Sequence, residues 1–449
     1  MRGLRRTSTT SAALAILALV LALAAPARAQ RGGFVGETRC GNPTCHGAGL
    51  PRDEAARKIW RPWKSARTQW RNRAIDRHSR AYDTLTTAGS KAIAGFMGVD
   101  ATRSEKCLVC HAPAATLAAK SGHRRSDGVS CEHCHGPAEH WLQVHVERDW
   151  KAKKPQYLAR GFYNNNNFSQ RARKCASCHV EIDHEIVAAG HPPLQFELVA
   201  YAQIMKHWDD QDEQPPGAYS VDPTIWAVGQ LTGLRQSMRM LARRAGRDNY
   251  QGLGKFPHFQ DRNCYQCHHK LVDDAVRQAR GHYQMVDAIL ASVAPGERGA
   301  LGERWRGVVG ASQSSAGAAR DRARGLERWL ASFEDLVRRQ PIGRDATKTI
   351  LRRLTASADE LKRIERFRFS RSPSSNVVAM DNVSSPWWWT TGAPEQTILA
   401  IQALCDPAYG ARCRAIDGDM NALVRAVDRW DYRPDAFAAS LGAIGAKLR

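Results

Sequence analysis

Four short segments of the chain place a cysteine, a second cysteine three positions later and a histidine directly after it. They are Cys107-Leu-Val-Cys110-His111, Cys131-Glu-His-Cys134-His135, Cys175-Ala-Ser-Cys178-His179 and Cys264-Tyr-Gln-Cys267-His268. Two thiols about one helical turn apart can bond the two vinyl groups of a porphyrin, and the adjacent imidazole can bind its iron. Cysteine pairs also build tetrahedral zinc sites, but zinc does not require a histidine after every second cysteine. The spacing therefore predicts covalently attached haem c with these four histidines as iron ligands.

A wider motif, Cys40-Gly-Asn-Pro-Thr-Cys45-His46, lies closer to the N-terminus. Four residues separate its cysteines, and a histidine again follows the second one. The extra residues can loop out while the thiols keep their separation, so we interpret Cys40 and Cys45 as a fifth attachment site and His46 as its iron ligand. The alternative is a disulfide in an oxidising compartment beside an incidental histidine. The haem interpretation gives about five haems.

Each iron bound in this way has a sixth position that a second histidine can fill. Besides the five motif histidines, 11 of the 16 histidines remain, so the supply of distal ligands is adequate. His78 falls in a predicted helix, and His184 and His191 closely follow the fourth motif. We predict these three as distal iron ligands; the alternative for each is helix capping or ordinary packing.

The third motif belongs to a longer string, Gly128-Val-Ser-Cys-Glu-His-Cys-His-Gly-Pro137. It resembles multihaem cytochromes c that include the tetrahaem electron carriers of bacterial ammonia oxidation, in which a Gly-Val-x-Cys-Glu-x-Cys-His-Gly-Pro string is followed by a ligand histidine ten residues after the proximal one. Here that residue is His145, so the resemblance implies that His145 is an axial ligand. His133, between its own two cysteines, is a poor candidate. The resemblance covers roughly residues 36–270; the wide first motif, the fifth haem and the C-terminal extension depart from it.

Residues 1–29 have the pattern of a secretory signal. Arg2, Arg5 and Arg6 precede an apolar run of 14 residues from Ala12 to Ala25, and a small-x-small cleavage site ends at Ala29. The run is short for a membrane span, and no later segment is long and apolar enough to be one. We therefore expect a periplasmic or extracellular protein without a transmembrane span in the mature chain.

The chain has 449 residues, 43% of them hydrophobic, and a net charge of +22. A basic surface can attract acidic redox partner proteins or the anionic surface of a membrane. No nucleic-acid-binding motif accompanies the charge, and export argues against a nucleic-acid partner.

The expected fold is mainly α, with a multihaem cytochrome c domain of little regular strand at 30–271 and a helical bundle at 272–449. A helix is predicted from Asp222-Pro223, an N-cap and first-turn pair, to Gly246. Apolar stripes predict further helices around 326–337, 350–364, 398–404 and 420–430. Trp387, Trp388 and Trp389 are expected between the bundle and the haem domain, or else at a partner. Cys405 and Cys413 have no following histidine, so a disulfide is expected.

Two imidazoles on an iron close it to substrate, which suits electron relay better than catalysis. The sequence thus favours an electron carrier. The alternative is a redox enzyme in which one haem stays five-coordinate and acts on a small nitrogen or sulfur compound, because four distal candidates serve five irons. A third hypothesis is a sensing module that signals through the C-terminal helices.

Overall fold

The computed structural model describes residues 32–40, 77–113, 123–150, 152–192, 194, 196–204, 222–247, 255–258, 261, 276–364, 392–427 and 433–449. Every regular element within these ranges is a helix, which confirms the mainly α prediction. Short helices make up the part of the chain that carries the haem motifs. They are η1 (Arg77–Arg80), α2 (Glu37–Cys40), α5 (Ala81–Thr84), α6 (Ala88–Phe96), α7 (Glu105–His111), η3 (Arg125–Asp127), α8 (Cys131–His135), η4 (Val144–Val146), α9 (Lys154–Ala159), α10 (Phe168–His179), α11 (His184–Ala188) and α12 (Leu198–Ile204).

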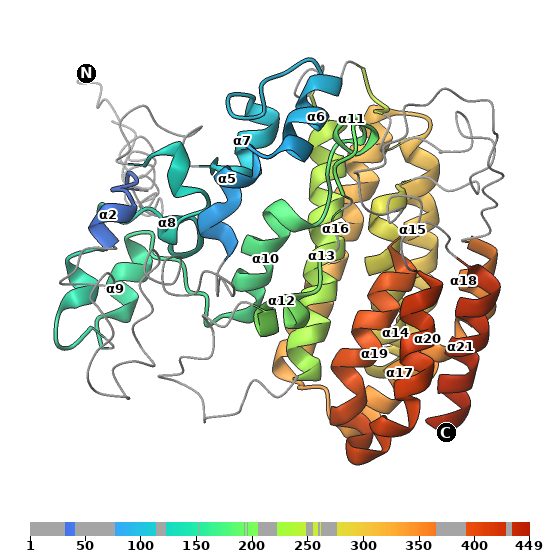
Figure 1. Cartoon of the computed structure of the whole chain (residues 1–449). Helices are drawn as coiled ribbons and strands as arrows, with labels where there is room; N and C mark the ends of the chain where they lie inside the picture. The colour runs from blue at the N-terminus through green and yellow to red at the C-terminus, as the bar shows by residue number, and fades with distance from the viewer. Residues whose placement is uncertain are drawn as a thin grey trace, which may run out of the picture.

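The remaining helices follow, and the long ones among them stand side by side as a bundle, with the short helices given above on one side of it (Figure 1). They are α13 (Pro223–Arg244), η9 (Arg277–Ala279), α14 (Arg280–Val293), η10 (Pro295–Glu297), α15 (Arg298–Ser312), α16 (Ala316–Arg339), α17 (Arg344–Ala356), α18 (Ala358–Ile364), α19 (Ala393–Tyr409), η12 (Gly410–Ile416), α20 (Asp417–Ala426) and α21 (Pro434–Lys447).

Helix α13 begins and ends where the sequence predicts. The Asp222 carboxylate accepts a hydrogen bond from the backbone N–H of Thr224 at 2.7 Å, and Pro223 occupies the first turn, where its missing N–H costs nothing. The predicted apolar face, formed by Leu231, Leu234, Met238 and Leu241, is fully buried. A helix with such a face gains most of its stability from packing rather than from propensity.

The bundle helices pack around α13, which contacts α16 along most of its length and α10 on the haem side. Arg235 of α13 pairs with Glu334 and, at 2.8 Å, with Glu327 of α16. Arg173 of α10 reaches the same Glu334 at 3.4 Å. These ion pairs join α10 and α13, which precede residue 271, to α16, which follows it. Helices from both sides of that residue therefore share one packed core. The domain division at that residue stays a prediction.

Apolar packing differs between the two parts of the described chain. One large buried cluster runs from Ala172 of α10 through the whole bundle to Leu448. Around the second and third haem motifs the described residues form only small clusters, one centred on Leu85 and Leu108 and another on Trp141 and Tyr157. A segment with so little apolar core of its own depends on other groups to fill its interior.

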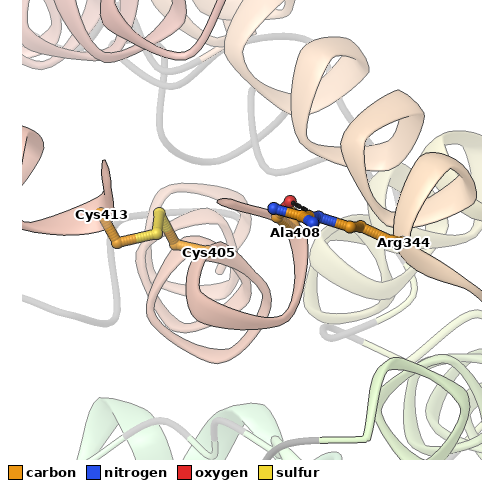
Figure 2. The surroundings of a disulfide bond; sticks show 4 residues. All are labelled: Arg344, Cys405, Ala408 and Cys413. Atoms are coloured by element: carbon orange, nitrogen blue, oxygen red, sulfur yellow. Dashed lines mark hydrogen bonds between the residues drawn. A yellow bond between two sulfur atoms is a disulfide. The ribbon is translucent and has the colours of Figure 1, made fainter. Parts of the chain in front are cut away.

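Cys405 of α19 and Cys413 of η12 form the predicted disulfide, with Cα atoms 5.8 Å apart (Figure 2). Beside it, the Arg344 side chain at the start of α17 donates a hydrogen bond to the Ala408 carbonyl at 2.8 Å. A cation on a carbonyl in the last turn of a helix compensates the unpaired acceptor there. The bridge and this contact fix the C-terminal end of α19 against α17.

Most described residues of the apolar stripes of the C-terminal region are buried, while Trp329, Leu336 and Met420 are partly buried. Leu326, Leu330, Phe333 and Val337 of α16 face the core, as do Ile350, Leu351, Leu354 and Leu361 of α17 and α18 and Ile398, Ile401 and Leu404 of α19. Val424, however, is 42% exposed, because neighbouring residues of a helix point about 100° apart and Leu423 takes the core-facing position of α20.

Several predictions fall outside the described residues. These are the signal at 1–29, the motif residues Cys45, His46, Cys264, Cys267 and His268, and the tryptophans at 387–389. Among the helices that the structure describes, none combines the length and the apolar character that a bilayer span requires.

Candidate haem-binding site

His78 and His179 face each other among the short helices that carry the haem motifs. His179 ends α10 as the last residue of the fourth motif, and His78 comes from η1, far earlier in the chain. Their ring centres are 6.0 Å apart and their planes are nearly perpendicular, at 81°. The structure thus brings a predicted distal ligand to a motif histidine.

His111 and His191 form a second pair of the same kind. His111 ends α7 in the second motif, and His191 follows α11. Their ring centres are 6.3 Å apart, with an angle of 77° between the planes. The two pairs are crossed relative to chain order, since His78 precedes the second motif but faces the fourth, while His191 follows the fourth but faces the second.

These separations match an iron between two imidazoles. With metal–nitrogen bonds of about 2.0 Å on both sides, the ring centres lie about 6.3 Å apart. Edge-to-face ring packing spans the same range, so the ring nitrogens must decide between the two. Nδ1 of His111 lies 2.8 Å from the Ala81 carbonyl and Nδ1 of His191 lies 2.7 Å from the Pro192 carbonyl. A metal-binding histidine is held in this way, with Nε2 left for the metal. The His111–His191 pair therefore fits a haem iron by separation and by its ring nitrogens, and the His78–His179 pair fits one by separation.

Burial keeps several of these imidazoles neutral, which is the form that binds a metal. It lowers the pKa of His179 to about 4, with the neighbouring His78 and His111 adding to the effect. Burial also lowers the pKa of His191 and of His145. At pH 7 these rings have no proton to lose before they bind iron.

Thiols from the second and fourth motifs meet, with His78 nearby. Cys110 and Cys178 are within hydrogen-bonding reach, and this contact raises the pKa of Cys110 and lowers that of Cys178 to about 6. Each thiol is the second of its motif, so the attachment points of two haems adjoin. Two redox centres anchored at adjoining points are suited to exchanging electrons.

The third motif forms α8. In its longer string, Gly128 and Gly136 stand at positions where a side chain would collide with the backbone of another segment. Gly136 has φ +86°, and a Cβ there would overlap the Gly161 carbonyl, next to the place where Tyr163 N–H binds the His135 carbonyl at 2.8 Å. Gly128 has φ +62°, and a Cβ there would come within 2.6 Å of the His78 carbonyl. Val129 N–H donates to that same carbonyl at 3.1 Å. These close approaches fix η1, and with it His78, against the third motif.

Glu132, inside the third motif, belongs to the string that carries the family resemblance, but the sequence does not reveal that it positions other segments. Its buried carboxylate accepts hydrogen bonds from the backbone N–H groups of Val35, Gly36 and Ala138 at 2.7 to 3.2 Å. The His123 ring lies 2.8 Å away. Burial favours the protonated form, but these bonds outweigh it and lower the pKa of Glu132.

The same contacts bring Cys40 to the third motif. Val35 and Gly36 are held by Glu132, α2 follows them directly, and Cys40 at its end lies within hydrogen-bonding reach of Cys131. The first thiols of the first and third motifs therefore meet, as the second thiols of the second and fourth do. Cys107, Cys134 and Cys175 lie in α7, α8 and α10 with their motif partners.

The remaining predicted ligands are placed as follows. His135 stacks on Phe162 with ring centres 5.7 Å apart. His145, in η4, has Nδ1 2.7 Å from the Leu142 carbonyl and its ring against Trp141. His184 is the first residue of α11. The axial roles of these three, like those of the two pairs above, stay predictions.

Glu197 is a buried carboxyl near the fourth motif that the sequence does not single out. Burial raises its pKa to about 7, although the Ala200 and Val199 N–H groups donate to it at 2.5 and 2.9 Å. Tyr201, on the same short helix, contacts the His179 ring with 5.1 Å between ring centres. Glu197 thus caps α12, the helix that packs on a motif histidine.

We expect the Glu197→Gln variant to change how stability depends on pH. In the wild type the pKa rises on folding from 4.5 to about 7, so the folded state binds the proton more tightly, and stability falls as pH rises through this window. Glutamine does not titrate, so the variant should not show this loss, which amounts to about 3 kcal/mol of unfolding free energy. Urea unfolding at pH 5 and pH 8 should show the variant gaining on the wild type at pH 8, whereas the exposed control Glu297→Gln should not. Parallel pH profiles for Glu197→Gln and wild type would contradict the expectation.

Comparison with known proteins gives one match. Residues 43–136 match the family model described as cytochrome c554 and c-prime, which confirms the resemblance to a multihaem cytochrome c family. The match covers about a fifth of the chain and includes the second and third motifs. No curated protein and no solved structure shows significant similarity to the chain.

Proposed function

We propose that the chain is an exported multihaem c-type cytochrome that carries electrons through about five covalently attached haems. Each haem, when bound, supplies an iron that gains and loses one electron. The chain attaches the haems through the cysteines of its five motifs and binds the irons through the histidine of each motif. His78, His145, His184 and His191 serve as distal ligands.

The observation that carries this proposal is the pairing of His78 with His179 and of His111 with His191 at axial separation. Two neutral imidazoles on opposite sides fill both axial positions of an iron and exclude a substrate from it. The chain's role at these sites is then to hold the ligands rigidly, because an iron with unchanged ligands needs little rearrangement on reduction. The adjoining thiols of Cys110 and Cys178 support relay between two such sites.

Export and basic charge complete the proposal. A signal at 1–29 would deliver the unfolded chain to the compartment in which c-type haem is attached and the Cys405–Cys413 disulfide persists. The net charge is +22 for the whole chain and +18 once Arg2, Arg5, Arg6 and Arg28 are removed with the signal. It would attract acidic redox partner proteins, with association at an anionic membrane surface as a further consequence.

The test is the mass of the whole protein after expression in a host competent for haem attachment. We expect a chain cleaved after Ala29 that carries five haems, and the Cys40→Ala, Cys45→Ala double variant should carry four. A colourless product, or one that contains zinc, would overturn the proposal. An electron paramagnetic resonance spectrum of the oxidised protein decides against the enzyme alternative when it contains no high-spin ferric signal.

A further inference from the structure

His258 lies between α13 and α14, and its side chain is only 1% exposed. Within the part of the chain that the structure describes, neither its Nδ1 nor its Nε2 has a hydrogen-bond partner. An unpaired buried polar group costs about 1–3 kcal/mol, and native proteins retain few of them without a reason. Because Asp261 lies on the Nδ1 side of the ring, it is the buried Nε2 that points to a ligand that is not part of the polypeptide.

The surroundings of His258 are those of an oriented metal ligand. An oxygen of Asp261 lies 3.6 Å from Nδ1, beyond hydrogen-bonding distance but on that side of the ring. Asp261 is itself fixed by two hydrogen bonds from the Arg244 guanidinium, at 2.6 and 3.0 Å. A carboxylate at one imidazole nitrogen commonly orients the ring so that the other nitrogen binds a metal.

The same network places His258 on the haem side of the molecule. Arg244 also binds Glu181 at 2.9 Å, and Glu181 is the second residue after the motif histidine His179. All three charged side chains are at most 4% exposed. His258 is therefore held beside the end of the fourth motif rather than inside the C-terminal bundle.

We propose that His258 is the distal ligand, bound through Nε2, of a haem iron other than that of His179, whose second ligand is His78; the inference rests on the function proposed above. Five motifs supply five irons, whereas the sequence patterns supply four distal histidines, His78, His145, His184 and His191. His258 is the fifth distal histidine, one for each iron. With it every iron has two imidazoles, and the position that a redox enzyme would need for its substrate is filled.

The experiment compares the oxidised holo-protein with the His258→Ala and His258→Met variants by electron paramagnetic resonance. We expect no high-spin ferric signal in the wild type and one high-spin haem per protein in His258→Ala, which added imidazole converts back to low spin. In His258→Met a thioether replaces the imidazole, so one haem should be reduced at a higher potential than any in the wild type. The control is His140→Ala, because the His140 side chain is 39% exposed and has no assigned role; its spectrum should be unchanged.

The outcomes separate this inference from the function on which it rests. Haem counts from whole-protein mass are taken on the same samples. Five haems with one high-spin signal already present in the wild type, and spectra unchanged in both His258 variants, would overturn the role of His258 while leaving the multihaem cytochrome intact. Fewer than five haems in the wild type would instead overturn the proposed haem count. If His258→Ala yields no folded protein, the potential measured in His258→Met decides.

Discussion

Replacement of His191 by alanine should give the ferrous protein one binding site for carbon monoxide, where the wild type has none. His191 faces His111 with 6.3 Å between ring centres, and its Nδ1 is held by the Pro192 carbonyl, so its removal opens the sixth position of the iron that His111 binds. The His78→Ala variant should open one further site at His179, and the double variant should bind two molecules. Carbon monoxide titration followed by absorption spectroscopy measures the stoichiometry directly.

The matched control for these variants is His282→Ala. His282 is buried, whereas the four paired histidines are half-buried. Its Nδ1 lies 2.8 Å from the Gln230 side-chain oxygen within the bundle, and burial lowers its pKa to about 4. Its loss should lower stability without creating a carbon monoxide site. If His191→Ala behaves like His282→Ala, with lower stability and no binding, the histidine pair is ordinary packing and its axial role is wrong.

The sequence identifies which residues bind haem better than which residues bind the same haem. A motif such as Cys107 to His111 follows from covalent chemistry within a few residues, so its spacing alone predicts it. His78 and His191 are recognisable as spare histidines near such motifs, but chain order would assign His78 to the second motif. In the structure His78 lies beside His179 of the fourth motif. The helices η1 and α10 that carry these residues are far apart in the sequence, and only the fold brings them together.

Helices can be predicted from the local sequence, whereas the roles of buried charged residues cannot. The faces of α13 and α16 were predictable because a period of 3.6 residues is a local property, and Asp222 and Pro223 mark a helix start by local chemistry. Glu132 stands in the string that carries the family resemblance, but the string does not say what its carboxylate binds, and Arg244 belongs to no pattern. The role of each comes from the burial that distant segments impose, which no local spacing records.

Arg244 carries the largest stability effect that we expect from one substitution. Its guanidinium lies between the carboxylates of Glu181, at 2.9 Å, and Asp261, at 2.6 Å. Burial raises the pKa of Glu181 even beside this cation, whereas at Asp261 the cation outweighs burial and lowers the pKa. An Arg244→Met variant keeps the apolar stem but leaves two buried carboxylates without their counter-charge. Breaking a buried ion pair in this way costs about 3–5 kcal/mol, and we expect a loss in that range at pH 7.

Urea unfolding monitored by far-ultraviolet circular dichroism measures this loss, because helix content reports on the whole bundle. The control is Arg338→Met on α16, whose side chain is 46% exposed and pairs with Asp335 at 3.4 Å; an exposed pair of this kind contributes at most about 1 kcal/mol. A triple variant with Arg244→Met, Glu181→Gln and Asp261→Asn removes the uncompensated charges together and should recover part of the stability. Equal effects of Arg244→Met and Arg338→Met would mean that the two carboxylates are not held ionised in a dry interior. In that case Asp261 could not orient the His258 ring in the way that the inference above requires.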